Sequence, residues 1–507
     1  MKLSGCAQMR EIDRHVISDL GVPGARLMAA AAQETAAAAM EFLPVQNGRA
    51  AVFCGVGNNG GDGIGAAALL LEKGVFTRVF LVGDAEKLTP DSKKMLDILI
   101  ERGGLLEPFD TAAGIEEFLN ECGVVIDALF GIGLNSELRG NFLTAVEMIN
   151  SSPARKISAD IPSGVCADTG RILGAAVKAD LTVTFSLAKA GHFVEPGCTC
   201  CGELRVRNIG IPREIIDDAP PFAHAVMPED ISLPRRRPDT HKGDYGRVLI
   251  VAGSVGYTGA PALCARAASR TGAGLVYLGV PAGIYTAMAV KLTEEMPFPL
   301  AQEKSGRFAK QDVEKLLELA RQCDACLIGP GLGQSPEAVQ LVLSVLRTSK
   351  TPVILDADGI NAITGNINIL DNAACPLILT PHPGEFARLG GDLSNGDRLS
   401  AARNFAQKHG CILALKGHRT ITATPDGAAY INTTGGPAMA KGGSGDVLAG
   451  MIAALVAQKF PIKDAVLAAV YLHGAAGDMC ALELGEYSVT ASDIIDMLPK
   501  VMKKVII

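Results

Sequence analysis

The stretch AAVFCGVGNNGGDGIGAAALLLEKG, residues 50–74, decides the fold of the first half of the chain. A short apolar run leads into a glycine-rich loop at 55–63, and residues 64–73 then have the spacing of an apolar helix. A buried strand that passes through glycines into a helix is how a doubly wound α/β sheet begins. Residues 55–60 also satisfy G-x-G-x-x-G, so the loop amides and the helix amino terminus can face a pyrophosphate.

Short runs of Val, Ile and Leu alternate with helical patterns along the rest of the chain. Parallel strands buried on both faces, joined by crossover helices, produce this pattern. In the first half it predicts a Rossmann-like doubly wound sheet, with strands near 50–54, 78–82, 124–128, 155–160 and 181–185.

The pattern lapses between about 212 and 240, where the sequence is dense in proline and charge. We therefore expect a boundary near 220, with domains at 1–218 and 224–507. The second half restarts with RVLIVAGS and predicts another, larger α/β domain, with strands near 247–254, 275, 326, 353, 377 and 412. The glycine loops of the two halves differ, which favours fusion of unlike domains over duplication.

Composition limits the classes of function. The 507 residues exceed the roughly 250–300 at which single cores stop growing, so two domains are expected. A net charge of −7 argues against nucleic acid as a partner. The first fifteen residues are charged and lack the apolar core of a signal peptide, and no apolar run approaches the roughly 18 residues of a membrane span. A cytoplasmic protein without a membrane partner is the resulting expectation.

The thirteen cysteines are scattered along the chain. Cys54, Cys326 and Cys411 lie inside apolar runs, which indicates reduced core thiols. The group at 198–201 lacks the spacing of a zinc site and is expected in a surface loop.

Polar residues in the glycine loop point to a ligand site. Asn58, Asn59 and Asp62 occupy positions where a plain dinucleotide-binding loop needs only small residues. Asn and Asp also favour turns, so a purely structural role remains an alternative.

Two further strand ends in the first half carry polar groups, because Asp127 follows one predicted strand and Asp160 and Ser163 follow the next. Such carboxyl ends line the ligand crevice of an open α/β sheet. Oxygen ligands from Asn59, Asp127 and Ser163 would suit a hard cation. Helix or turn capping by the two aspartates is the alternative.

The motifs GVGNNGGDG, DALFGIGL at 127–134 and DIPSG at 160–164, in this order, resemble the epimerase domain of the NAD(P)H-hydrate repair enzymes over about residues 1–215. The resemblance implies a potassium ion held by Asn59, Asp127 and Ser163. Interconversion of R and S hydrates at C6 needs an acid/base carboxylate, and Asp160 is the candidate for that role. The resemblance also implies that the hydrated cofactor contacts Asn58, Asn59, Gly60, Gly61, Asp62, Gly131, Ile132, Gly133, Leu134, Asn135, Ser136, Glu137 and Asp160.

The second half contains GGPAMAKGGSGDVLAGMIAALVAQ at 435–458, a glycine-rich turn that leads into an apolar helix near Asp446. The turn amides and the helix amino terminus can stabilise the charge of a transferring phosphoryl group. Asp446 then stands where a base could deprotonate an attacking hydroxyl. Helix capping by Asp446 is the structural alternative.

Other strand ends of the second half converge on the same edge. ILALKGHRT at 412–420 delivers Lys416 and Thr420, a cation and a hydroxyl suited to phosphates. LILTPHPGE at 377–385 delivers His382 between two prolines. An exposed lysine and a structural histidine are the plain alternatives. Two more strand-to-loop turns are CLIGPGLG at 326–333 and VILDADG at 353–359.

These loops and AGSVGYTGAP at 252–261 resemble the ADP-dependent NAD(P)H-hydrate dehydratase domain, a ribokinase-like fold, over about residues 225–505. The resemblance implies hydrate contacts at Ala260, Gly333, His382 and Asp446. It implies nucleotide contacts at Lys416, Gly417, His418, Arg419, Thr420 and Gly445.

The two resemblances together imply an enzyme that epimerises the R and S forms of NADHX and NADPHX, the hydrates of NADH and NADPH. It would dehydrate the S form at the expense of ADP, giving AMP and phosphate. Mg²⁺ is expected at the phosphates without assignable ligands, and a homo-oligomer is expected. Two alternatives stay open. The second half could phosphorylate a small vitamin precursor such as a hydroxyethylthiazole or pyridoxal, or the first half could bind nucleotide or act as a scaffold without turnover.

Overall fold

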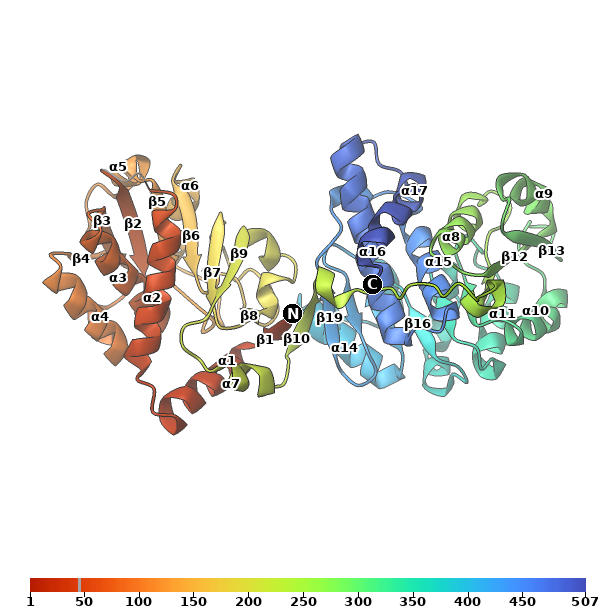
Figure 1. Ribbon diagram of the computed structural model, residues 1–507, viewed down its shortest axis with the longest axis horizontal. Helices are drawn as coiled ribbons and strands as arrows, with labels where there is room; N and C mark the ends of the chain where they lie inside the picture. The colour runs from red at the N-terminus through yellow and green to blue at the C-terminus, as the bar shows by residue number, and fades with distance from the viewer. Residues whose placement is uncertain (44–46) are drawn as a thin grey trace. The chain divides into compact units, whose positions relative to one another are not determined.

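The computed structural model describes residues 1–43 and 47–507, and the chain divides into two compact units (Figure 1). Lys2–His224 form the first unit, and Met1 with Ala225–Ile507 form the second. The division falls a few residues after the composition-based boundary, because residues 223 and 224 pair with Leu3 and Lys2 in an antiparallel ladder.

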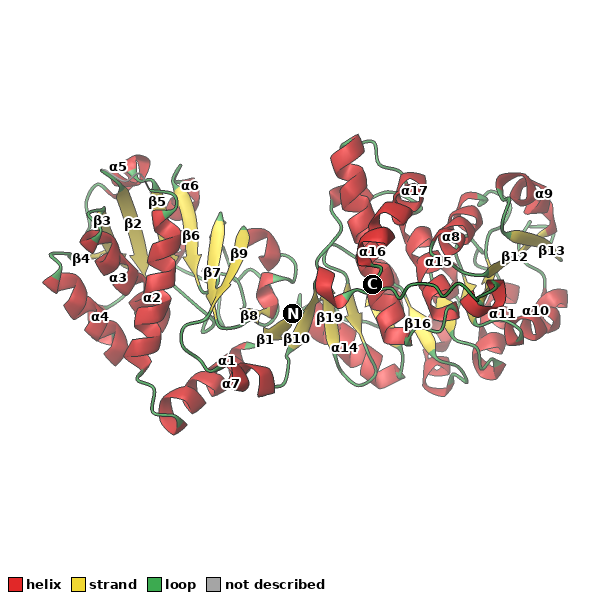
Figure 2. Cartoon of the chain, viewed as in Figure 1, coloured by secondary structure: helices red, strands yellow, loops and turns green. Residues whose placement is uncertain are grey.

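The sheet of the first unit is parallel throughout, in the order β4-β3-β2-β5-β6-β7-β9 (Figure 2). Its strands are β2 (Arg49–Cys54), β3 (Phe76–Leu81), β4 (Leu106–Pro108), β5 (Val124–Ala128), β6 (Arg155–Ala159), β7 (Leu181–Phe185) and β9 (Glu203–Arg207). The sequence does not predict the edge strands β4 and β9, because they are short or half exposed and lack a buried apolar run. Outside this seven-stranded sheet, β1 (Lys2–Ser4) pairs with β8 (Ala188–Lys189) and with β10 (Ala223–Val226).

Helices cover both faces of this sheet, as in a doubly wound fold. Residues 50, 52 and 54 of β2 pack on one face with α2 (Gly24–Met40), α3 (Asn58–Glu72) and α4 (Pro90–Glu101). Residues 51 and 53 pack on the other face with α5 (Ile115–Glu121) and α6 (Asn141–Ser151). The remaining helices of the unit are α1 (Cys6–Arg14), a π-helical turn (His15–Asp19) and α7 (Arg213–Asp218).

Helix α3 begins at Asn58, six residues before the predicted start, so most of the predicted glycine loop is helical. The glycines serve close packing. A Cβ on Gly60 would lie 1.8 Å from the carbonyl oxygen of Gly55, and one on Gly63 would lie 2.5 Å from the Cβ of Ala128. The sequence shows the glycines but not which backbone approaches them.

The second unit holds a larger sheet, in the order β13-β12-β11-β14-β15-β16-β17-β18-β19. The strands are parallel as far as β17, and β18 and β19 are antiparallel. Their bounds are β11 (Arg247–Val251), β12 (Leu275–Pro281), β13 (Met296–Leu300), β14 (Ala325–Ile328), β15 (Val353–Leu355), β16 (Leu377–Leu379), β17 (Ile412–Leu415), β18 (Ile421–Ala423) and β19 (Ala429–Asn432).

One core cluster of the second unit joins β11 and β12 to a helical layer made of α8 (Gly259–Arg270), α15 (Ser444–Ala457), α16 (Ile462–Leu484) and α17 (Ala491–Met502). Helix α15 is buried on nearly all sides. The other helices are α9 (Ala282–Lys291), α10 (Val313–Arg321), α11 (Pro336–Thr348), α12 (Asp358–Asn361), α13 (Pro383–Arg388) and α14 (Arg398–His409).

Helix α16 corrects the expectation that no apolar segment approaches the length of a membrane span. By length and composition alone it could cross a bilayer, with a mean hydropathy of 1.5 in its most apolar window. That window is 67% buried within the unit, and α16 packs in the core with α15 and α17. The helix therefore has the environment of a core helix.

All thirteen cysteines are free thiols. The expected surface loop at 198–201 is wrong in part, because Cys200 and Cys201 are buried. Cys201 lies where its Sγ can donate to the carbonyl oxygen of Gly197 at 3.3 Å.

Candidate active sites

Asp160 is the residue at which the first site is built. It follows the last residue of β6 and has a φ of +66°, a left-handed conformation that non-glycine residues rarely adopt. Its amide donates to Val183 at 2.7 Å, and its carbonyl oxygen lies 3.0 Å from Nε2 of buried His192. Such strain persists where surrounding contacts impose it, and it concentrates at functional sites.

A buried lysine holds the Asp160 side chain. Lys189 is 1% exposed, and its Nζ donates to the Asp160 carboxylate and to Oγ1 of Thr184 at 2.8 Å. Burial opposes ionisation of Asp160, yet the charge and hydrogen bond of Lys189 hold its pKa below the ordinary value. Asp160 is therefore a carboxylate anion. We did not predict Lys189 from the sequence, although a lysine within the apolar run at 181–190 was an available signal.

A cavity of about 570 Å³ opens at this edge of the sheet. Seven of the predicted substrate residues line it, namely Asn58, Asn59, Asp62, Gly131, Ile132, Gly133 and Asp160. The other six do not. Gly60 and Gly61 are buried in α3, Leu134 is half-buried outside the lining, and residues 135–137 are exposed.

Three further carboxyl groups line the same cavity, those of Asp13, Asp62 and Asp91. Burial raises the pKa of Asp13 to about 6 and that of Asp62 well above its ordinary value. Asp160, whose pKa is lowered, thus shares the cavity with two carboxyl groups, Asp13 and Asp62, that retain protons more readily. Asp13 lies on α1, outside every motif that the sequence suggested.

Of the predicted cation ligands, Asn59 lines this cavity, whereas Asp127 and Ser163 lie outside its lining. Asn59 has both side-chain polar atoms buried without a hydrogen-bond partner in the structure. Asp127 is fully buried inside β5, whereas the sequence placed it after the strand. Its carboxylate accepts from Ser163 Oγ at 2.5 Å and from Ser158 Oγ at 2.8 Å. A buried amide without a partner, a carboxylate and a hydroxyl are together a set of oxygen donors that suits a hard cation.

The structural alternative for Asp127 also has support. Besides the two hydroxyls, its carboxylate accepts from the amides of Leu129 at 3.3 Å and Ser163 at 2.9 Å. These bonds fix the DIPSG loop to β5, so Asp127 organises the loop whether or not it also binds a cation.

In the second unit the predicted residues follow parallel strands that are neighbours in the sheet. The loops after β11, β14, β15, β16 and β17 therefore meet at one edge. Ala260 lies against the loop after β14, where a Cβ on Gly331 would be 3.3 Å from it. Gly333 donates its amide to Asp358 at 2.8 Å, which ties that loop to the one after β15.

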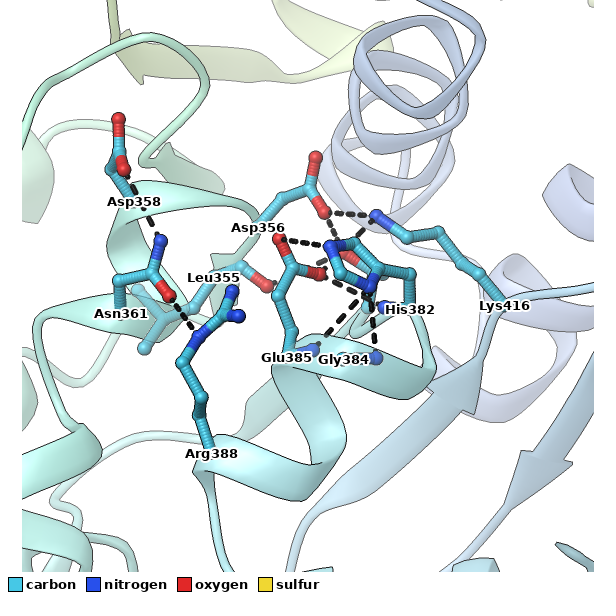
Figure 3. Close-up of polar contacts among 10 residues, drawn as sticks. Leu355, Asp356, Asp358, Asn361, His382, Gly384, Glu385, Arg388 and Lys416 are labelled. Atoms are coloured by element: carbon cyan, nitrogen blue, oxygen red, sulfur yellow. Dashed lines mark hydrogen bonds and ion pairs between the residues drawn. The ribbon is translucent and has the colours of Figure 1, made fainter. Parts of the chain in front are cut away.

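Lys416 is the centre of a buried charge cluster (Figure 3). Its Nζ donates to Asp356 at 2.6 Å and lies 3.9 Å from Glu385. Burial opposes its charge, but these two carboxylates raise its pKa above the ordinary value. The exposed-lysine alternative is wrong, because this side chain is 19% exposed and paired. Asp356 and Glu385 were missed because nothing in the sequence shows which strand ends lie beside Lys416.

Asp446 is the third residue of α15, in the turn that follows Gly443 with a φ of +97°. The preceding residue touches the charge cluster, since a Cβ on Gly445 would be 3.4 Å from the Nζ of Lys416. Burial, and then the charge of Asp356, raise the pKa of Asp446 to about 7 against the opposing effect of Lys416. The capping alternative lacks support, because no side chain caps this helix.

His382 is the N-cap of α13, and its Nδ1 accepts from the amides of Gly384 at 3.0 Å and Glu385 at 3.3 Å (Figure 3). In the neutral ring this places the proton on Nε2. Its side chain is 52% exposed. His382 therefore has a structural role through Nδ1, and its Nε2 lies 3.5 Å from Oε1 of Glu385.

A cavity of about 430 Å³ adjoins the charge cluster, and five of the six predicted nucleotide residues line it: Lys416, Gly417, His418, Thr420 and Gly445. Arg419 does not, because its guanidinium donates to the carbonyl oxygen of Thr433 at 2.7 Å. Ala260, Gly333, His382 and Asp446 lie outside this lining. His473 of α16, which we did not predict, also lines the cavity, and its Nε2 is buried without a partner in the structure.

Two family models match the chain. One, described as the N-terminus of YjeF-related proteins, matches residues 24–191, and the other, described as NAD(P)H-hydrate dehydratase, matches residues 248–500. The bifunctional NAD(P)H-hydrate repair enzyme Nnr of Thermofilum pendens is 40% identical, covering 99% of this chain and 96% of that relative. The protein of the same name from Moorella thermoacetica is also 40% identical, covering 99% and 97%.

Among solved structures, a ribokinase-like superfamily protein from Enterococcus faecalis V583 is similar to 56% of this chain and 96% of its own, with 29% identity and a TM-score of 0.50. An ADP/ATP-dependent NAD(P)H-hydrate dehydratase from Bacillus subtilis, co-crystallised with ATP and Mg²⁺, covers 56% and 99% with 33% identity and a TM-score of 0.48.

Proposed function

The chain belongs to the family of bifunctional NAD(P)H-hydrate repair enzymes, and we propose that each unit carries one of the two activities. The first unit interconverts the R and S forms of NADHX and NADPHX at C6. The second unit dehydrates the S form to NADH or NADPH and converts ADP to AMP and phosphate. Support comes from the two family models, which match different halves of the chain.

For the dehydratase, the proposal rests on the position of Asp446 at the amino terminus of α15. Asp446 directly follows Gly445, and Gly445 lies against the Nζ of Lys416. A base with a pKa of about 7 can accept a proton near neutrality. Lys416 and the helix amino terminus supply positive potential for phosphate oxygens. The adjoining cavity has room for the nucleotide donor.

Asp446 takes the proton of the C6 hydroxyl, whose oxygen attacks the β-phosphorus of ADP and releases AMP. The lone pair of the ring nitrogen then expels phosphate from C6, and loss of the C5 proton restores the dihydropyridine. Phosphorylation is needed because hydroxide is a poor leaving group. Mg²⁺, when bound with the nucleotide, would neutralise phosphate charge during transfer.

For the epimerase, the C6–O bond must break and form again on the opposite face of the ring. We infer that a protonated carboxyl donates to the leaving hydroxyl, water departs as the ring nitrogen forms a double bond to C6, and a carboxylate deprotonates the water that adds. Asp160, held ionised by Lys189, suits the base, and Asp13 suits the acid. Epimerisation in ¹⁸O-water should then label the C6 hydroxyl.

The potassium site is part of this proposal. Asn59, Asp127 and Ser163 would hold the ion, and the unpartnered Asn59 amide supports that assignment. Potassium would supply a fixed positive charge near the cavity. Asp127 and Ser163 also keep the loop of Asp160 in place through their mutual hydrogen bonds.

Cytoplasmic location and self-association are further proposals. Thirteen free thiols, most of them buried, are compatible with a reducing compartment. Leu482 and Tyr487, 87% and 96% exposed at the end of α16 and just beyond it, offer an apolar surface to a second copy. Light scattering of the purified chain measures the oligomeric state.

The decisive experiment mixes the purified protein with an R,S mixture of NADPHX, Mg²⁺, K⁺ and either ADP or ATP, and follows the dihydronicotinamide absorbance. Full recovery with ADP supports both activities and the donor. Recovery of half leaves only the dehydratase. No recovery with either nucleotide, together with a stable phosphate ester of an offered vitamin precursor, would favour a small-molecule kinase.

A further inference from the structure

A basic cavity lies in the second unit at the amino ends of the parallel strands, whereas Asp446 lies at their carboxyl ends. It has a volume of about 850 Å³, and its lining includes Thr271 and Gly272, just before β12, and Gln458, just after α15. Asp446 is at the other end of α15, and 14 helical residues span roughly 20 Å. The cavity is therefore separate from the proposed dehydratase site.

Positive charge dominates its lining. Five cations line it, namely Arg235, Arg236, Arg237, Arg270 and Lys503, against one acid, Asp244. Two of these charges are engaged locally, because Arg237 lies 3.6 Å from Asp239 and the Asp244 carboxylate accepts from the amide of His241. Within residues 225–507, all of which are described, the side chains of Arg235, Arg270 and Lys503 make no ion pair and are exposed. Their charge is available to an anion.

Contacts within the protein hold Arg236 and Tyr245, which form one wall of the cavity, in a fixed arrangement. The guanidinium of Arg236 stacks 3.7 Å from the ring centroid of Tyr245 and donates to Gln458 at 3.1 Å and to the carbonyl oxygen of Gly272 at 2.5 Å. The hydroxyl of Tyr245 lies 2.7 Å from that of Thr240. Apolar side chains form another part of the lining, namely Leu233, Leu455, Phe460 and Met502. The cavity thus combines unpaired cations with an apolar wall.

We propose that this cavity binds a phosphorylated organic anion of the nucleotide class. Arg235, Arg270 and Lys503 take the phosphates, and the apolar wall takes the organic part. The chemistry fits, since guanidinium groups bind phosphate through two parallel hydrogen bonds and a base needs an apolar surface. The segment RRRPDTHKG at 235–243, which neither proposed activity uses, thereby gains a role.

The test is equilibrium dialysis of the full-length protein with labelled ADP, comparing the unmodified chain with two double variants. Arg270→Ala with Lys503→Ala removes two cations from the cavity. Arg266→Ala with Lys504→Ala removes the same charge from outside it, and Arg266 lies one turn earlier on α8 while Lys504 is the next residue after Lys503. Neither pair belongs to the proposed catalytic machinery.

We expect two ADP equivalents per chain for the unmodified protein and for the outside control. In the cavity variant the second equivalent should weaken roughly tenfold for each cation removed, and added salt should weaken it further in the unmodified chain. Inorganic triphosphate should compete less well than ADP for the second equivalent. One equivalent in the unmodified chain, equal binding by both variants, or triphosphate competing as well as ADP would each overturn the proposal.

Discussion

Each unit contains a lysine, largely shielded from solvent, that pairs with a carboxylate at the end of a parallel strand. Lys189 pairs with Asp160 in the first unit, and Lys416 pairs with Asp356 in the second. Removing two charges from water costs several kcal/mol each, so such pairs are weak evidence for stability. Their position in or beside a cavity makes them better evidence for function.

Replacing Asp446 by Asn should remove the proposed base of the dehydratase. We expect the dehydratase kcat to fall by about 10²- to 10⁴-fold, the usual contribution of a general base. Epimerisation, measured by exchange between separated R and S hydrates, should not change, and it serves as the control for folding. A variant that keeps the full dehydratase rate would contradict the role of Asp446.

The dehydratase should also depend on pH through Asp446. Burial raises its pKa to about 7, and a base must be deprotonated, so kcat/KM should rise as pH increases toward 7 and level off above it. Below that pKa the rate should fall about tenfold per pH unit. A flat profile between about pH 5.5 and 8, with circular dichroism unchanged over that range, would argue that Asp446 does not titrate during the reaction.

Replacing Lys189 by Met should leave Asp160 buried without its cation. We expect the free energy of unfolding to fall by about 3–5 kcal/mol in urea titrations at pH 7. The folded pKa of Asp160 is lowered, so the stability from this pair is present above the ordinary carboxyl pKa and is lost as pH falls through the lowered value. The difference between the two proteins should therefore shrink in acid.

Lys178→Met is the matched control for that change, because Lys178 is an exposed lysine of the same unit. Its effect should stay within about 0.5 kcal/mol, as for ordinary surface positions. If both variants lose the same free energy of unfolding, the buried ion pair contributes no more to stability than an exposed lysine does.

At the scale of single elements, helix α3 shows how packing can use a sequence that looks like a loop. Its first two turns contain glycines whose missing side chains let the helix approach β2, β5 and the residue after β2. That approach places Asn59 and Asp62 on the cavity. The amino terminus of α15 does the same for Asp446, where Gly443 and Gly445 precede the aspartate.

Gly60→Ala tests this reading of α3. A Cβ there would lie 1.8 Å from the carbonyl oxygen of Gly55, so the helix must move, and we expect a loss of about 1–3 kcal/mol in unfolding free energy. Gly57→Ala is the control, because nothing lies within 4 Å of its Cβ position and it should cost less. If thermal denaturation finds the two variants equally stable, close packing does not explain the glycine.

At the scale of the whole molecule, each unit has its own sheet, core and candidate site. Cavities of about 570 and 430 Å³ lie within single units. Each activity should therefore respond to changes in its own unit.

The reactivity of the cysteine thiols measures how well the packing of the chain excludes a reagent. Only Cys6, Cys166 and Cys198 are partly exposed, and the other ten are buried. A disulfide reagent should modify about three thiols quickly in the native protein and all thirteen in denaturant without reductant. Fewer than thirteen in denaturant would reveal disulfides, and rapid reaction of all thirteen in the native state would show that the cores are open to the reagent.

Strand positions could be read from the sequence wherever a strand is buried on both faces. The predicted strands in both halves lie within a few residues of those observed, because a run of Val, Ile and Leu records burial directly. Asp160 and Lys416 could also be predicted, since each follows such a strand within a recognisable motif, and Asp446 could be predicted from the glycine-rich turn that leads into an apolar helix.

Only the tertiary structure decided which side chains meet. Lys189, Asp13, Asp356 and His473 reach the candidate sites from strands and helices far apart in the sequence, and no local pattern records their partners. The positive φ of Asp160 and the helical start of α3 are likewise imposed by neighbouring backbone. The sequence by itself determined the two α/β units and their motifs, because apolar runs and the spacing of glycines are local features that can be identified without knowing the fold. Packing decided the charge pairs and pKa shifts, because they depend on distances between residues that only the folded chain brings together.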